Sequence, residues 1–406
     1  MPALDGMRVL DMTQYEAGTS CTQLLAWLGA EVVKVEPPTG DPGRGVGAGM
    51  DHTQYFMNYN ANKRSIQLNL KDPRGRELLL KLAPHFDAFV ENYGPGAIEG
   101  LDIGYETMKA VNPRIIYARI KGFGLSGPYS GFNSYDWVAQ AAAGTFSVTG
   151  EPDGPPTHPG PTFGDTGTGM QMALAITAAY VQQQRTGEGQ FIEISMQEAV
   201  TMFMRTLGLM NWGKEPAPRT GIHHGQALVS TYPCKGDGPN DWVFIMPTTQ
   251  SMWDALLTVL DRHDLLTDER FSNPARMAEN RMALYEEVAQ WTRQRTKHEA
   301  MEVLGTAGVP CSYVFDTMDL FTDPHLTERE FIQTVDHPAV GEVQLMRNPI
   351  RMEGVVPLQH SPLLGGDTEA VLRHDLGLSG AEIAELLGSG AAANGAPVPA
   401  SSQQSS

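Results

Sequence analysis

The chain of 406 residues is 41% hydrophobic and 19% charged, a balance typical of a globular protein with room for two or three domains. Its formal net charge of −18 argues against nucleic acid and anionic membrane as partners, although a helix N-terminus or a local basic cluster can still hold a phosphate. No apolar run approaches the roughly 20 residues that cross a bilayer, and the N-terminus MPALDGMRVLDM has no signal-peptide pattern, so we expect a cytoplasmic protein.

The first forty residues predict a strand, a helix and a second strand. Residues 7–12 form a short apolar strand, residues 21–30 a helix that stops near Gly29, and residues 31–38 a β-branched strand ended by two prolines. This order is a βαβ unit, and Glu36 lies at the end of its second strand. The loop after the first strand is not G-x-G-x-x-G, so the unit is Rossmann-like without support for NAD.

Strands and helices continue to alternate as far as residue 212. Helix 168–184 is apolar nearly all round, which predicts that it is buried. The alternation favours an α/β domain with a mainly parallel sheet. The further predicted elements are helices at 74–86, 135–144 and 197–212, and strands at 87–93, 114–124 and 189–196.

The composition of the chain changes after the last of these helices, and this change predicts a second domain. A Pro/Gly-rich linker is followed by a strand, several amphipathic helices and another strand, which indicates a smaller α+β domain. The C-terminal LGSGAAANGAPVPASSQQSS is of low complexity and predicted to be disordered. The expected boundaries are 1–205 for the large domain, 206–225 for a linker, 226–327 for the small domain, 328–339 for a second linker, 340–387 for a return to the large domain and 388–406 for the tail.

A single carboxylate stands among glycines in PTFGDTGTGM, residues 161–170, directly before helix 168–184. An aspartate in front of a helix is usually an N-cap. Glycines also allow a backbone to approach a ligand closely. From the local sequence, Asp165 is therefore a candidate cap, phosphate-loop neighbour, metal ligand or nucleophile.

Seven segments of the chain follow one another in the order of a known family pattern. They are LDGMRVLDMTQYEAGTSCTQLLAWLGAEVVKVEPPTGDPGRG, NANKRSIQLNLKDPRGRELLLKL, FVENYGPGAIEGLDIGYE, NPRIIYARIKGFGLSGPY, TGEGQFIEISMQEA, AGVPCSYV and SPLLGGDTEAVL. Through these segments, about residues 5–387 resemble the type III CoA-transferase family, the group that includes formyl-CoA transferase and carnitine CoA-transferase. The resemblance implies an interlocked homodimer of ring-shaped subunits, each with a Rossmann-like large domain built from both chain ends and a smaller α+β domain.

The resemblance implies that Asp165 is the catalytic nucleophile of an enzyme that moves CoA from an acyl-CoA to a carboxylic acid. An aspartate can attack a thioester and form a mixed anhydride, then an aspartyl-CoA thioester. Glycines beside it would leave room for backbone N–H groups to approach the oxyanion. CoA enters as a substrate, and no metal is expected.

Further site residues are carried over from the family by position, and each has a structural alternative. Lys71 is otherwise a surface lysine, Asn92 and Gly94 a turn after a strand, and Tyr135 a packed aromatic. The implied roles are contact with CoA for Glu16 and Ala17, an adenosine site for Leu68, Asn69, Leu70 and Lys71, the pantetheine and diphosphate for Asn92, Tyr93 and Gly94, and an active-site tyrosine for Tyr135.

Several positions depart from formyl-CoA transferase. Glu16 stands in place of a glutamine, Val46 of a tryptophan, and Pro37 of an arginine, and a flexible glycine-rich loop is missing. Oxalate with formyl-CoA is therefore not the expected substrate pair, and the CoA phosphates need other cations. The candidates are Arg44, Lys63 and Arg64.

The sequence offers weak metal-ligand patterns. Cys21, Cys234 and Cys311 are far apart, which predicts neither a disulfide nor a zinc site. The pair His223–His224 leaves a metal or acid/base role open, but neighbours in sequence rarely point the same way.

Two rival functions remain on the same fold. An α-methylacyl-CoA racemase needs an acid/base pair, and its histidine falls where this chain has Tyr135. A tyrosine, with an ordinary pKa near 10, is a poor base at neutral pH. A non-catalytic acyl-CoA-binding protein would not need Asp165 in its glycine frame.

Overall fold

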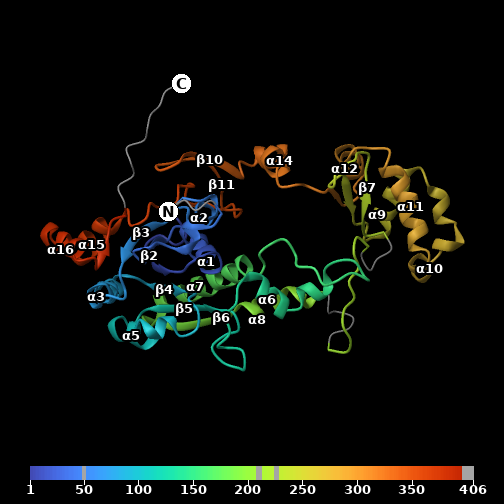
Figure 1. The fold of residues 1–406 in the computed structure, drawn as a ribbon. Helices are drawn as coiled ribbons and strands as arrows, with labels where there is room; N and C mark the ends of the chain where they lie inside the picture. Colours follow the sequence, from blue (N-terminus) through green and yellow to red (C-terminus); the bar gives the residue numbers. More distant parts are fainter. Residues whose placement is uncertain (48–51, 207–212, 224–227, 396–406) are drawn as a thin grey trace, which may run out of the picture. The chain divides into compact units, whose positions relative to one another are not determined.

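The computed structural model describes the chain except for residues 48–51, 207–212, 224–227 and 396–406 (Figure 1). The chain divides into two compact units, and the first takes residues from both ends of the sequence. Residues 146–157 belong to the second unit, although the sequence placed them in the large domain. There, Arg219 donates hydrogen bonds to the carbonyl oxygens of Glu151 and Gly154. Unit 1 comprises residues 1–145, 158–210 and 330–406, and unit 2 comprises residues 146–157 and 211–329.

A largely parallel sheet forms the centre of unit 1 (Figure 1). The strands run in the order β12-β3-β2-β1-β4-β5-β6, and among the described strands only β12 is antiparallel to its neighbour. This is the doubly wound order, which reverses direction between β1 and β4. The strands are β1 (Arg8–Met12), β2 (Glu31–Glu36), β3 (Arg64–Leu68), β4 (Ala88–Glu91), β5 (Ile116–Lys121), β6 (Gln190–Ser195) and β12 (Ala392–Ala393).

Successive residues of each strand face opposite sides of this sheet, so each side builds its own core. Leu10 and Phe89 belong to one core, and Val9 and Val90 to the other. The helices that contribute to the first core include α3 (Pro73–Leu82), α5 (Tyr105–Val111), α15 (Thr368–Leu376) and α16 (Gly380–Gly388). Those that contribute to the second include α1 (Ala17–Trp27), α7 (Thr166–Thr186) and the first residue of α8 (Met196–Thr201).

Unit 2 has a smaller antiparallel sheet with strands in the order β7-β8-β9. Trp253, Leu257 and Leu284 are buried in its core. Its elements are β7 (Ser230–Pro233), β8 (Trp242–Ile245), α9 (Gln250–Leu260), α10 (Pro274–Glu279), α11 (Arg281–Thr292), α12 (Lys297–Thr306), β9 (Cys311–Tyr313), α13 (Asp319–Thr322) and α14 (Pro324–Glu328). The remaining elements of unit 1 are α2 (Gln54–Asn60), α4 (Ala97–Gly100), α6 (Asp136–Ala142), β10 (Ile332–His337) and β11 (Gly341–Met346).

The structure corrects three predictions about these elements. Helix α1 begins at Ala17 rather than residue 21, so it takes up part of the expected loop. Helix α7 packs only one face on its neighbours, and Met170, Leu174 and Val181 are exposed, so it is not buried all round. The expected disordered tail is wrong for residues 388–395, because β12 pairs with β3; residues 396–406 lie outside the described part.

Candidate active site

The site is built where the strand order of the sheet reverses. The loops that leave the carboxyl ends of β1 and β4 lie side by side there, because these two strands are neighbours. In doubly wound sheets this crevice is the usual place for a ligand. The first loop carries Glu16 just before α1, and the second carries Asn92 and Gly94 just after β4.

A pocket at this point brings together most of the site residues expected from the sequence. Glu16, Ala17, Asn92, Tyr93, Gly94, Tyr135 and Asp165 all line it. Tyr135 is 64% exposed and meets the ring of Tyr15 edge to face, with the ring centroids 6.1 Å apart. The alternative of Tyr135 as a packed core aromatic is therefore wrong.

Asp165 occupies the N-cap position of α7, but its side chain makes no cap hydrogen bond. Its backbone N–H donates instead to Asp136 Oδ1 at 2.9 Å, which fixes the start of the helix on α6. The Asp165 carboxylate therefore does not cap the helix, and the residue lines the pocket. Burial, together with the charges of Glu16 and Asp136, raises the pKa of Asp165 to about 8.

Glu16 is a second carboxylate beside Asp165, and it is held by hydroxyl groups. Its Oε1 accepts hydrogen bonds from Thr166 Oγ1 at 2.8 Å and from Thr162 Oγ1. Tyr59 of α2 hydrogen bonds to the same carboxylate, and burial followed by the Glu16 charge raises the pKa of Tyr59. Glu16 is only 4% exposed, so its position is fixed by these partners.

The loop after β1 is clamped by the loop after β4. Asn92 Oδ1 accepts from the backbone N–H of Gln14, and Asn92 Nδ2 donates to the Gln14 carbonyl, each at 2.9 Å. Tyr15 follows with φ of +58°, a left-handed conformation that costs a non-glycine residue free energy. Its N–H donates to Asp41 Oδ1 at 3.2 Å, which helps to hold this conformation.

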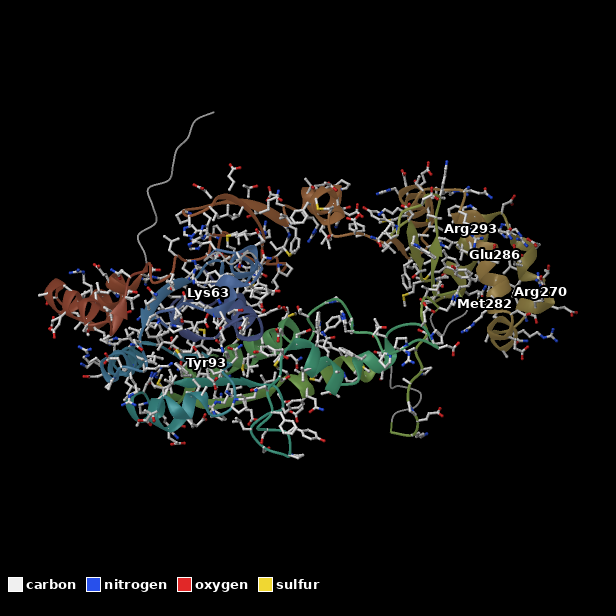
Figure 2. The ribbon with its side chains drawn as sticks, in the orientation of Figure 1. Lys63, Tyr93, Arg270, Met282, Glu286 and Arg293 are labelled. Carbon is white, nitrogen blue, oxygen red and sulfur yellow. The ribbon has the colours of Figure 1, made fainter. Side chains whose placement is uncertain are left out.

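A second pocket contains the other residues expected from the sequence. It is lined by Leu68, Asn69, Leu70 and Lys71, and it shares Gln14 and Tyr93 with the first pocket (Tyr93 is labelled in Figure 2). Its volume of about 400 Å³ exceeds the about 120 Å³ of the first. The larger pocket, called the wide pocket below, and the smaller, narrower one therefore share two lining residues.

The three cations suggested for phosphate binding are engaged elsewhere, so that suggestion is wrong for this structure. Lys63 (Figure 2) is buried and pairs with Asp11 Oδ2 at 3.0 Å. Arg44 is buried against Glu36 at 2.7 Å. Arg64 pairs with Glu31 and Asp367 on the outside of the sheet. Lys71 is exposed beside the second pocket.

The glycines around Asp165 serve protein packing, not the open approach to the oxyanion that the sequence suggested. A Cβ on Gly169 would lie 2.5 Å from the Ala17 carbonyl oxygen, and one on Gly164 would lie 2.5 Å from the Asp136 carbonyl oxygen. Side chains at these positions would push α7 away from α1 or from α6. The glycines thus set the position of Asp165 by close backbone contact.

Comparison with known proteins shows the family of this chain. The model of the family described as CoA-transferase family III matches residues 4–368. The chain belongs to CoA-transferase family III. It is 37% identical to a formyl-CoA:oxalate CoA-transferase of Streptomyces coelicolor, over 96% of this chain and 98% of that protein. It is 36% identical to one of Rhodopseudomonas palustris strain BisA53, over 96% and 97%.

Solved structures of the same fold are also similar to this family III enzyme. A CAIB/BAIF family protein from Brucella suis has a TM-score of 0.80 and 31% identity, covering 92% of this chain and 99% of that one. A hypothetical protein from Mycobacterium tuberculosis has a TM-score of 0.80 and 25% identity, covering 91% and 99%.

Sequence reasoning missed the side chains of this CoA-transferase that hold the Glu16 carboxylate and the Asp165 backbone. Thr162 and Thr166 flank Asp165 in the glycine-rich segment, so their spacing around it was the available signal. Asp136 gave no such signal, because it reaches Asp165 only through the packing of α6 on α7. Tyr59 comes from α2, which the sequence did not predict.

The remaining suggestions concern metals and membranes. Within the described residues, no group of three or more His, Cys, Asp or Glu side chains could hold a metal, and no helix is long and apolar enough to span a bilayer. His223 lies against Ser230 Oγ at 3.1 Å, and His224 lies outside the described residues. The three cysteines are free thiols.

Proposed function

We propose that this family III enzyme transfers CoA from an acyl-CoA to a carboxylic acid through covalent intermediates on Asp165. The observation that carries the proposal is the position of Asp165, an N-cap carboxylate that leaves its own helix uncapped and lines the pocket at the sheet's switch point. An N-cap that only stabilised α7 would accept a hydrogen bond from the first turn.

The chemistry follows from a carboxylate facing a thioester. An oxygen of Asp165 attacks the thioester carbonyl, the C–S bond breaks, and a mixed anhydride and CoA thiolate result. The thiolate then attacks the aspartyl carbonyl, which releases the donor acid and leaves an aspartyl-CoA thioester. The acceptor carboxylate runs the two steps in reverse, so no proton is consumed overall.

The start of α7 supports these steps electrostatically. Each addition puts negative charge on a carbonyl oxygen next to the helix N-terminus, where unpaired N–H groups and the helix dipole favour an anion. The nucleophile must be ionised to attack, so the raised pKa of Asp165 means that activity grows with pH up to about 8.

The two pockets, which share Gln14 and Tyr93 in their linings, suggest how the acyl-CoA lies. The wider pocket around Leu68 to Lys71 suits the adenosine, with Lys71 at a phosphate. The pantetheine would pass Gln14 and Tyr93 and bring the thioester to Asp165 in the narrower pocket. Asn92 acts on this path indirectly, by holding the Gln14 backbone.

We further propose that the enzyme is a homodimer. The exposed apolar side chains Met170, Leu174 and Val181 on α7 support it, since a monomer rarely leaves so apolar a helix face uncovered. For substrates, the names of the relatives make formyl-CoA and oxalate the first pair to assay, although Glu16, Val46 and Pro37 are changes from the pattern of formyl-CoA transferases.

The test is an intact mass measurement after incubation with a panel of short acyl-CoA donors and no acceptor. A CoA-thioester adduct that maps to Asp165 and is absent in Asp165→Ala is the expected result. No adduct with any donor, together with exchange of the α-proton of a branched acyl-CoA in heavy water, would instead indicate a racemase. If neither reaction occurs but the protein binds acyl-CoA tightly, the result would indicate a non-catalytic acyl-CoA-binding protein.

A further inference from the structure

The carboxylate of Glu16 is the feature of the pocket that the transfer chemistry does not require. Neither step of CoA transfer needs a second acid beside the nucleophile. Yet Glu16 is almost fully buried, lines the pocket, and accepts a hydrogen bond from Thr166, the residue next to Asp165. A buried charge is expensive, so its retention beside the reacting atoms calls for a function.

The hydrogen-bond partners of Glu16 carry no positive charge. They are the hydroxyl groups of Thr162, Thr166 and Tyr59, which stabilise a carboxylate by hydrogen bonding but carry no positive charge. Among the described residues, no lysine or arginine forms an ion pair with Glu16.

The charges that surround the pair add to this negative field. Asp136 of α6 also lies beside Asp165 and accepts a hydrogen bond from its backbone N–H. The cation lining the pocket, Lys121 of β5, is paired with Glu91 at 3.1 Å and donates to the Tyr93 carbonyl at 2.5 Å. Burial, followed by the charges of Glu16 and Asp165, also raises the pKa of Tyr55 of α2.

We propose that Glu16 is a specificity-determining residue that selects acceptor acids with no second negative charge next to the reacting carboxylate. The inference rests on the proposed role of Asp165 and deepens it, since it names the class of acid that discharges the aspartyl-CoA. The substrates it favours are monocarboxylic acids, with neutral hydroxyl or amide groups tolerated. Long dicarboxylic acids escape the effect because their far end lies away from Glu16.

Coulomb's law sets the size of the effect. The two carboxylates of oxalate are directly bonded, so its second charge must lie within a few ångströms of the reacting atoms and of Glu16. At such a separation and an intermediate effective dielectric constant, repulsion slows the reaction by at least about tenfold. Oxamate has nearly the same shape but replaces one carboxylate with a neutral amide, so it isolates the charge.

The experiment measures how fast acids discharge the CoA adduct of the full-length protein, prepared with the donor that gives most adduct. The acids are matched pairs: oxalate with oxamate, malonate with malonamate, and succinate with succinamate. In the unchanged protein, oxamate should react at least about tenfold faster than oxalate, and the ratio should fall along the series as the second charge moves away.

Two variants of Glu16 separate charge from structure. Glu16→Gln keeps the shape and an acceptor for the threonine hydroxyls, and it should bring the oxamate-to-oxalate ratio to within about twofold of one. Glu16→Asp keeps the charge and should keep the selectivity. Circular dichroism and melting temperature of both variants confirm the fold. In Glu16→Gln the pH profile should also move to lower pH, because one charge that raises the pKa of Asp165 is gone.

Each other outcome counts against the proposal. Equal discharge by oxalate and oxamate in the unchanged protein overturns it, as does a ratio that Glu16→Gln leaves unaltered. The proposal is also overturned if no acid of any pair discharges the adduct, in the unchanged protein or in Glu16→Gln. Neutralising Glu16 would then admit no further acceptor acid. Failure to form an adduct at all is a different result, which removes the proposed function itself.

Discussion

Glu16 and Asp165 occupy the N-cap positions of α1 and α7, and neither side chain caps its own helix. The two helices pack together so closely that Gly169 of α7 faces the carbonyl of Ala17. Two helix starts therefore meet at one pocket with both carboxylates directed away from their usual partners. Helix N-termini favour an anion in such a pocket, and burial followed by the Glu16 charge raises the pKa of Asp165.

Replacement of Gly169 by alanine should damage the site by moving α7. The added Cβ would lie 2.5 Å from a backbone oxygen of α1, which no rotamer change can relieve. We expect a loss of roughly 2 kcal/mol or more in the free energy of unfolding, with a large fall in kcat. The matched control is Gly305→Ala in α12, where a Cβ meets nothing within 4 Å and alanine should be neutral or stabilising. Equal effects of the two changes in urea unfolding would contradict the close packing.

Asp165 should make stability and activity depend on pH in opposite directions. Its pKa of about 8 lies above the ordinary aspartate value of 3.8, so the folded protein binds more protons between these values and loses stability as pH rises through them. Activity should rise over the upper part of the same range. Asp165→Asn should therefore raise the melting temperature by roughly 2–4 °C at about pH 9 and by much less near pH 4. A uniform shift across pH would show that the carboxylate titrates normally.

Asn92→Ala should weaken acyl-CoA binding through the backbone of Gln14. The change removes both hydrogen bonds that clamp the first loop, each worth roughly 0.5–1.5 kcal/mol. We expect KM for the acyl-CoA to rise by about tenfold, with a smaller change in kcat. If Asn92 merely shaped its own turn, the melting temperature would drop while KM stayed constant.

Lys71→Ala should raise KM for acyl-CoA and reduce the salt dependence of binding, because an exposed lysine at the wide pocket is the proposed phosphate contact. The loss should be roughly threefold to thirtyfold. Lys81→Ala is the control, an exposed lysine paired with Glu77 on α3. Two variants with identical kinetics would remove Lys71 from the site. The same assay on free CoA and dephospho-CoA would show which phosphate it meets.

Leu174→Glu should disrupt the proposed homodimer. Leu174 is 72% exposed in the single chain, so a charge there costs little in a monomer but opposes burial against a partner. Light scattering coupled to size exclusion should show a shift toward monomer. Val303→Glu on α12, where the valine is 42% exposed, is the control in unit 2. A monomeric unchanged protein would contradict the proposal directly.

The sequence predicts this fold where periodicity is strong and fails where contacts are distant. The βαβ start and the carboxylate before α7 follow from local patterns, and the family resemblance is confirmed. Strand β12 has only two residues and no periodicity, so only its pairing with β3 reveals it. Lys63 and Arg44 form ion pairs with Asp11 and Glu36 and are therefore not free to bind phosphate. No local sequence pattern predicts these ion pairs.

The position of β12 near the end of the sequence also has a consequence for the order in which the chain folds. The backbone N–H of Asn69 donates to the Ala391 carbonyl at 2.9 Å, so the segment that lines the wide pocket is braced by residues near the C-terminus. All of unit 2 lies between these two segments in the sequence. During synthesis, the edge of β3 that pairs with β12 therefore stays unpaired until almost the whole polypeptide has emerged. The proposed nucleotide pocket is finished last, and an enzyme cut short before residue 391 should aggregate at that edge before it ever holds its substrate.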